Sequence, residues 1–280
     1  MMSFAEQYAA KQIDVFGALA KIKSNSVVWT SYNAAEPTLF LNNLHTIADR
    51  VSNVQLRHAG VVRPYPFMMD PEMKDHFTPA SGFSDDYSRY VHDRRSTIFT
   101  PGHLHNGLER SGVYDAIDVL ICAVSPMDKN GYFRMALDNI SELDTAEIAK
   151  MVILEVNPNF PRTHGDNIIH ISDIDYWYES DIPLVTIPNS EPNEIDMAIG
   201  KNVASLVPDG ATIQLGIGSI PDAVAKFFME KNDLGVHTEM ITSSVATLAK
   251  AGMITGKKKT LNRYKIVGNF AFGSQDLYDF

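Results

Sequence analysis

Cysteine is almost absent from this chain of 280 residues, which contains Cys122 alone. A single cysteine permits no internal disulfide and no zinc site built from several thiolates. Cys122 lies within the apolar run from Val119 to Val124. That setting predicts a buried core thiol rather than a reactive one.

Long apolar runs are also missing, because no uninterrupted stretch approaches the ~18 residues of a membrane span. The N-terminal segment has no signal-peptide core, and no arginine precedes Arg50, as an arginine-rich transit peptide would require. These features predict a cytoplasmic protein with no membrane partner.

Basic residues are fewer than acidic ones, with 24 Lys and Arg against 34 Asp and Glu and a net charge of −10. A dedicated nucleic-acid binder normally carries a basic domain, so no nucleic-acid partner is expected. A small anionic ligand is still compatible with this charge through local donors. The length and the 45% of apolar residues predict a folded chain of about two domains, at ~150 residues each.

Short apolar runs alternate with helical patterns along the chain, which is typical of an α/β fold. Several runs are apolar at nearly every position, as strands covered on both faces must be. The sequence therefore predicts a mainly parallel sheet with helices on both faces. Strands are expected at 26–30, 53–58, 96–100, 116–124, 150–156, 167–172, 184–187 and 211–215. Helices are expected at 37–49, 145–149, 194–207 and 222–230, after a first amphipathic helix carrying Phe4, Tyr8, Phe16 and Leu19.

The turn-rich segment 188–193 contains two prolines, two asparagines and a serine, and a fresh helical pattern follows it. This segment predicts a boundary between an N-terminal α/β domain, 1–190, and a second domain that begins at 191. The second part, 191–280, is short for an independent α/β domain and stops without a polar tail. It is expected to be the incomplete start of its domain.

A glycine loop at 214–221 is the most informative local pattern, because an apolar strand leads into it and a helix follows. Gly216 and Gly218 let the backbone turn sharply, while the helix N-terminus adds unpaired N–H donors. The pattern alone fits a structural tight turn and an oxyanion or phosphate site equally well. Pro221 stands where a dinucleotide fingerprint needs its third glycine, so that motif is excluded.

Glu239 follows in the segment 234–240, where strand geometry would place it on the same face as His237. An isolated glutamate of this kind is most often a solvated carboxylate. The functional alternative is a carboxylate nucleophile, ionised at neutral pH. Carboxylates attack acyl groups weakly, so such a nucleophile needs an oxyanion hole, which the glycine loop could supply.

At this point the sequence resembles the acetyl-CoA hydrolase/transferase family, which includes 4-hydroxybutyrate CoA-transferase and acyl-CoA:acetate CoA-transferases. The resemblance lies in consecutive motifs that cover most of the chain in order, at 124–133, 156–166, 214–224, 233–240 and 252–261. It implies a family I CoA-transferase with two related α/β domains, 1–190 and 191–280 here, and an active site between them. The second domain would be truncated in this chain.

The resemblance also implies the roles of particular residues. Glu239 would attack the thioester of a short-chain acyl-CoA, and a glutamyl-CoA thioester would then pass CoA to a carboxylic acid such as acetate, butyrate or 4-hydroxybutyrate. Coenzyme A would be a substrate, with no permanently bound cofactor. Backbone donors and CoA contacts would come from Gln214, Gly216, Ile217, Gly218, Ser219, Ile220 and Pro221.

Four further residues are weaker substrate-site candidates. Glu36 and Pro37 resemble the family's first-domain loop that faces the cleft, although they also make a good helix start. Arg162 could pair with a substrate carboxylate, and His164 could donate to the acyl oxygen. Either residue is equally compatible with an exposed turn. A complete protein of this family is expected to be a homo-oligomer.

Two departures from the family pattern stand out. Ser243 and Ser244 occupy the two positions at which the family usually has Asp-Gly. The turn after Glu239 is therefore expected to differ from the family's turn. The resemblance also ends at Phe280, whereas family members continue through the second domain. The isolated chain is therefore expected to be inactive or unstable, and to aggregate through an uncovered sheet edge.

Three alternatives stay open beside CoA transfer. The same glutamate could support acyl-CoA hydrolysis, with water as the acceptor. A metal-dependent hydrolase could use His103 and His105 with His58 or His164, but no metal site is favoured because Pro101-Gly102 indicates a loop. A non-catalytic binding fragment is the third. The lysines 257–259 indicate a solvated loop, and the aromatics 176–178 indicate packing.

Overall fold

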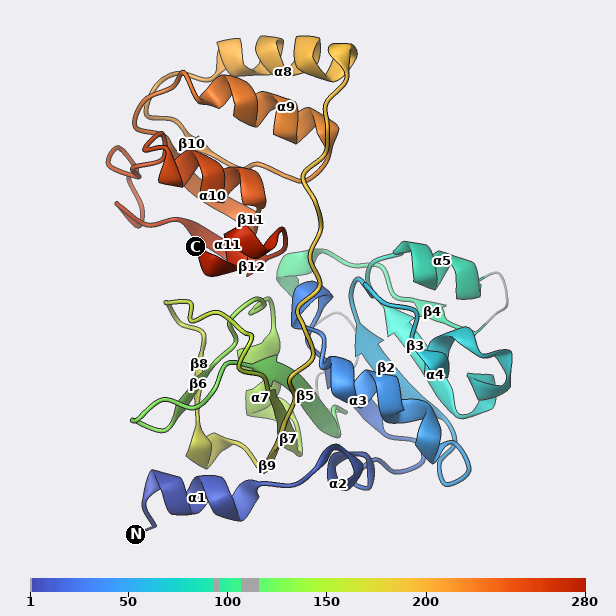
Figure 1. Ribbon diagram of the computed structural model, residues 1–280. Helices are drawn as coiled ribbons and strands as arrows, with labels where there is room; N and C mark the ends of the chain where they lie inside the picture. Colours follow the sequence, from blue (N-terminus) through green and yellow to red (C-terminus); the bar gives the residue numbers. More distant parts are fainter. Residues whose placement is uncertain (1, 93–95, 107–115) are drawn as a thin grey trace. The chain divides into compact units, whose positions relative to one another are not determined.

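The computed structural model describes residues 2–92, 96–106 and 116–280, and the chain divides into two compact units, Met1–Leu184 and Val185–Phe280 (Figure 1). Each unit is described here by itself. None of the described helices is long and apolar enough to cross a membrane.

The first unit contains helices and strands in mixed order. The helices are α1 (Phe4–Lys11), α2 (Val15–Leu19), α3 (Thr38–Asn43), α4 (Pro66–Met69), α5 (Asp86–His92) and α7 (Glu142–Ile148). The strands are β1 (Val27–Thr30), β2 (Val54–His58), β3 (Phe77–Ser81), β4 (Ile98–Phe99), β5 (Val119–Val124), β6 (Tyr132–Arg134), β7 (Val152–Val156), β8 (Ile168–His170) and β9 (Tyr176–Glu179). Short 3-10 helices lie at Asn33–Ala35, Leu44–Ile47, Pro71–Asp75, Leu104–Asn106 and Ile171–Asp173.

A seven-stranded sheet in the order β4-β3-β2-β1-β5-β7-β9 forms the centre of the first unit, and every neighbouring pair in it is parallel. Strands β6 and β8 form a separate antiparallel pair. The expected α/β architecture with a mainly parallel sheet is confirmed.

Apolar side chains cover both faces of this sheet, because successive strand residues point to opposite sides. On one face Val28 and Leu56 pack against α2, α3 and α4. On the other face Leu120 and Trp177 pack with α7 and the β6–β8 pair. Cys122 belongs to the second face and is fully buried, as expected, and burial raises the pKa of its thiol.

The second unit is built on a three-stranded parallel sheet in the order β10-β11-β12 (Figure 1). Its strands are β10 (Thr212–Ile213), β11 (Gly235–Ile241) and β12 (Val267–Ala271), and its helices are α8 (Glu194–Leu206), α9 (Ser219–Phe228), α10 (Ser243–Lys250) and α11 (Gln275–Asp279). Its core joins Val236 of β11 to Val224 and Phe228 of α9 and to Val245 of α10.

The first amphipathic helix is interrupted, so the expectation of one continuous helix was wrong. The break at residues 12–14 occurs because Asp14 accepts a hydrogen bond from Gly17 N at 2.6 Å and thereby begins α2. The backbone of Ile13 instead donates to Trp177 O. Tyr8 stacks on Trp177 with ring centroids 3.8 Å apart, but Phe16 is 59% exposed.

The strand expected at 184–187 is also absent, since the described residues 180–193 form no strand. Pro183 and Pro188 flank the segment and lack the N–H groups that a ladder needs. Within residues 184–187, Ile187 N donates to Gly273 O at 2.9 Å. The other expected strands coincide with β1, β2, β4, β5, β7, β8 and β10, whereas β3, β6, β9 and β12 were not anticipated.

The packing of α8 on α9 depends on Gly200. A Cβ atom at this position would lie 2.8 Å from the backbone carbon of Ala223, closer than real Cβ atoms approach. We expect Gly200→Ala to destabilise the second unit by about 1–3 kcal/mol through overpacking, despite the better helix propensity of alanine. Thermal unfolding measures this, with exposed Lys201→Ala as the control. Unchanged stability of Gly200→Ala would show that the helices separate freely.

Candidate functional site

The glycine loop connects β10 to α9 in the second unit. Gly218 has φ +115°, a left-handed conformation that disfavours any side chain, and it occupies the N-cap of α9. Pro221 lies in the first turn of the helix, where its missing N–H is not needed. Gln214, Gly216, Ile217 and Ile220 are exposed, while Gly218, Ser219 and Pro221 are partly buried.

Glu239 lies on β11, the central strand of the second sheet. The burial pattern alternates, with Val236 and Thr238 buried and His237 and Glu239 exposed. The two exposed side chains therefore share a face, as strand geometry predicted. Strands β10 and β11 are parallel neighbours, so their carboxyl ends lie at the same edge of the sheet. The glycine loop follows β10 at this edge, and Glu239 lies toward the same edge on β11.

Hydrogen bonds link the helix starts at this edge of the second sheet. Asp222 of α9 accepts from Ser244 Oγ at 2.6 Å and from Ser190 N at 2.8 Å. Ser243 Oγ accepts from Ser274 N at 2.8 Å, next to the start of α11. The Ser243-Ser244 departure thus lies at the first turn of α10, where both hydroxyls hold neighbouring segments in place.

The run of three lysines is not uniformly solvated, which corrects that expectation. Lys259 is buried, and its amine donates to Val236 O and Lys265 O, both at 2.7 Å. Burial lowers the pKa of Lys259. Lys257 is exposed and pairs with Asp233 at 3.3 Å. The amine of Lys259 therefore fastens the 257–265 loop to β11.

Glu36 is buried in the first unit, in the turn between β1 and α3. Its Oε2 accepts from Tyr65 Oη at 2.6 Å and its Oε1 accepts from Val62 N at 3.0 Å. Burial raises the pKa of Glu36 to about 8, although the hydrogen bonds and Arg63 oppose the shift. Glu36 therefore carries a proton over much of the neutral range.

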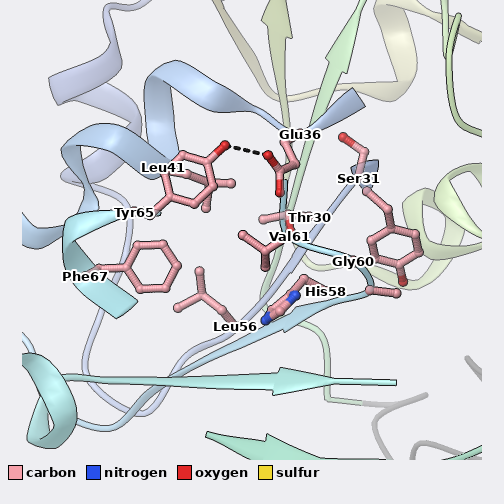
Figure 2. A pocket seen from close by; sticks show the side chains of 12 residues that line it. Thr30, Ser31, Glu36, Leu41, Leu56, His58, Gly60, Val61, Tyr65 and Phe67 are labelled. Carbon is pink, nitrogen blue, oxygen red and sulfur yellow. Dashed lines mark hydrogen bonds between the residues drawn. The ribbon is translucent and has the colours of Figure 1, made fainter. Parts of the chain in front are cut away.

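A small cavity of about 10 Å³ lies beside Glu36, on the face of the sheet that also carries Leu56. Figure 2 shows Glu36 and Tyr65 joined on one side of this cavity and the ring of His58 on another. Both ring nitrogens of His58 are buried without a partner. Burial lowers the pKa of His58 to about 4, so the imidazole is neutral at pH 7.

Two further buried carboxyl groups hold the turn that carries Glu36, and sequence reasoning missed both of them. Glu155 accepts from Leu39 N and Phe40 N at 3.2 Å each, at the start of α3, and from Tyr178 Oη at 2.7 Å. Asp138 accepts from Tyr32 N at 2.8 Å. The available signal was Glu155 itself, an acidic residue inside the apolar run of β7.

Asp138 and Glu142 form a buried pair of acids. Glu142 is fully buried and Asp138 is 2% exposed. Burial raises the pKa of both groups, to about 7 for Glu142. Repulsion from the Glu142 carboxyl raises the pKa of Asp138 further, because like charges repel. The pair consequently retains a proton at neutral pH.

The remaining sequence candidates are placed as follows. Pro37 is buried and forms the N-cap of α3, in line with the expected helix start. Arg162 and His164 are exposed on the segment between β7 and β8, where Arg162 lies 3.4 Å from Asp128. The rings of His103 and His105 stack at 5.5 Å. Among the residues described, no group of three or more His, Cys, Asp or Glu could hold a metal ion.

Comparison with known proteins decides the family. Residues 1–188 match the acetyl-CoA hydrolase/transferase N-terminal domain. The chain belongs to the acetyl-CoA hydrolase/transferase family. The resemblance deduced from the motifs is therefore confirmed.

Several relatives in this family match nearly the whole chain. The 4-hydroxybutyrate coenzyme A transferase of Clostridium kluyveri is 38% identical over 100% of the chain and 65% of its own length. The butyryl-CoA:acetate CoA-transferase of Anaerostipes caccae is 31% identical over 100% of the chain and 64% of its own length. The crystal structure of RipA from Yersinia pestis superposes with a TM-score of 0.93 at 29% identity, covering 99% of this chain and 67% of that one. The chain spans less than two thirds of these two curated relatives.

The raised pKa of Glu36 predicts how stability depends on pH. The folded-state pKa of about 8 exceeds the ordinary 4.5, so the favourable contribution of the protonated group is complete below pH ~4.5 and is lost as pH rises through 8. Glu36→Gln mimics the protonated acid and should become more stable than the unmodified protein toward pH 9, by on the order of a few kcal/mol.

Urea unfolding at pH 5, 7 and 9 measures this difference for Glu36→Gln. Glu72→Gln, at an exposed glutamate of the same unit, provides the control and should show no such trend. A difference for Glu36→Gln that stays constant with pH would mean that Glu36 ionises normally in the folded protein.

Proposed function

We propose that this chain carries the acyl-CoA chemistry of a family I CoA-transferase, with Glu239 as the nucleophile. The exposed position of Glu239 on the central parallel strand is the observation that carries the proposal. The glycine loop before α9 supports it, because free N–H groups in the first helical turn suit a developing oxyanion. The names of the two curated relatives support CoA transfer between an acyl-CoA and a carboxylate.

The proposed reaction has two half-reactions, and each half-reaction consists of two successive acyl substitutions. The Glu239 carboxylate attacks the thioester carbonyl, the C–S bond breaks, and a mixed anhydride and CoA thiolate form. The thiolate then attacks the glutamyl carbonyl, releases the first carboxylic acid and leaves a glutamyl-CoA thioester. A second carboxylate reverses these steps and departs as the new acyl-CoA. Exclusion of water protects the anhydride from hydrolysis.

Each candidate residue has a role in this scheme. The loop residues Gln214, Gly216, Ile217, Gly218, Ser219, Ile220 and Pro221 form the proposed oxyanion and CoA-binding segment. Glu36, Pro37, Arg162 and His164 are proposed to contact substrate. Coenzyme A is a substrate here, and no permanently bound cofactor takes part.

The proposed substrates are short-chain acids such as acetate, butyrate and 4-hydroxybutyrate, in the cytoplasm. Residues 1–190 are proposed as the N-terminal domain and 191–280 as the beginning of the C-terminal domain, in a protein that is a homo-oligomer when complete. The coverage of the relatives supports an incomplete second part, since about a third of their length has no counterpart in the chain.

Substitution of the nucleophile tests the proposal. Glu239→Gln keeps the size of the side chain but removes the attacking carboxylate, so CoA transfer should fall by at least 10³-fold, on the order of the loss when a group essential to covalent catalysis is removed. Glu230→Gln, at an exposed glutamate at the end of α9, is the matched control and should retain activity.

Mass spectrometry separates the possible outcomes. The protein from its natural source is incubated with a short acyl-CoA, its intact mass is recorded and its peptides are mapped. A CoA adduct on Glu239 that disappears when acetate is added is expected for transfer, with at most one equivalent of free acid released per protein before the acceptor is present. Continued release of free acid beyond one equivalent without an acceptor would identify hydrolysis. Full transfer activity in Glu239→Gln would contradict the proposed nucleophile.

A further inference from the structure

Two guanidinium nitrogens of Arg57, on β2, have no hydrogen-bond partner among the residues that the structure describes. These nitrogens, Nε and Nη1, are buried. Leaving a buried donor unpaired costs about 1–3 kcal/mol, and more for a charged group. Nη2 is not among these buried atoms, so the guanidinium is approachable through this one nitrogen.

Trp29 lies next to Arg57 and adds a second unpaired donor. The two residues are register partners across the parallel β1–β2 pair, so their side chains point to the same face of the sheet. Trp29 is 5% exposed, and its indole Nε1 is also buried without a partner. Two adjacent strands therefore direct unsatisfied N–H donors toward one face.

Two other arginines of the first unit have partners for their guanidinium groups. Arg50 donates to Ile22 O at 2.9 Å and to Leu19 O at 2.8 Å. Arg89 pairs with Asp86. Arg57 has neither kind of partner in the described part of the chain. Burial lowers the pKa of its guanidinium, and the titratable group that faces it among the described residues is Tyr32.

We propose that Arg57 and Trp29 form a binding site for a small oxyanion, either a carboxylate or a phosphate. A guanidinium forms charge-assisted hydrogen bonds with both groups, and here Nη2 is the nitrogen that an anion can approach. The unpaired indole N–H of Trp29 lies on the same face of the sheet. Partial burial strengthens this pairing because the surrounding dielectric constant is lower than that of water.

This site is distinct from the residues proposed for catalysis. Glu36 and His58 line the cavity on the face of Leu56, whereas strand alternation places Arg57 on the opposite face. Glu239 belongs to the second unit. Anion binding at Arg57 can therefore be tested independently of acyl transfer.

Thermal unfolding and tryptophan fluorescence test the proposal on the 280-residue chain. Inorganic phosphate, acetate and succinate are titrated at constant ionic strength, with chloride as the balancing salt. At least one oxyanion should raise the melting temperature and change the emission in a saturable way, because binding to the folded state stabilises it. The phosphate and carboxylate titrations identify which oxyanion the site prefers.

Three variants give the proposal its specific readout. Arg57→Met should weaken anion affinity by roughly tenfold or more, in keeping with the strength of charge-assisted hydrogen bonds. Without anion it should melt no lower than the unmodified protein, since it removes an unpaired charge. Trp29→Phe should abolish the fluorescence change, and Arg89→Met, which removes an exposed charge, should bind normally.

Three results would overturn the proposal. Equal anion affinities of Arg57→Met and the unmodified protein would show that the anion binds elsewhere. A clearly lower melting temperature of Arg57→Met in anion-free buffer would show that Arg57 is a structural residue with partners in the folded protein. No saturable response to any of the three oxyanions would likewise exclude the site.

Discussion

Parallel pairing of strands is the constraint on which the arrangement of both units depends. When neighbouring strands run in the same direction, their carboxyl ends meet at one edge, and the turns that follow them collect there. In the first unit this edge carries the turn with Glu36, which follows β1. In the second unit it carries the glycine loop after β10 and the start of α10 after β11. The residues proposed for chemistry therefore come from turns and strand ends rather than from helix interiors.

Buried acids stabilise the turn of the first unit by satisfying backbone donors. Glu155 binds two N–H groups at the start of α3, where the helix dipole favours a negative charge. Asp138 binds the N–H of Tyr32 at the other end of the turn. Glu36 itself, between these anchors, is kept from ionising by its apolar surroundings. Burial raises the pKa of Glu36, Asp138 and Glu155 alike, and the hydrogen-bond donors that reach each carboxyl group oppose that rise.

Arg57 and His58 differ from these buried acids because their buried nitrogens have no hydrogen-bond partner among the described residues. The orphan nitrogens of Arg57 and His58 lie on neighbouring residues of β2 but on opposite faces of the sheet. Burial disfavours the charge on both side chains, yet only the guanidinium keeps it at neutral pH, because its ordinary pKa is far higher. Arg57 is consequently a charged donor without an acceptor, whereas His58 is a neutral ring beside a small cavity.

The sequence by itself determined the α/β class, the parallel sheet, the burial of Cys122 and the family, because these follow from short-range periodicity and from contiguous motifs. It also placed His237 and Glu239 on one face, since alternation along a strand is a local property. Tertiary structure alone decided the hydrogen bond from Ile13 to Trp177 in the break between α1 and α2 and the burial of Lys259, each of which depends on a partner distant along the chain. It likewise decided the protonation of Glu36 and the unpaired state of Arg57. Desolvation and hydrogen bonding depend on which side chains surround a group, and that information exists only once the chain has folded.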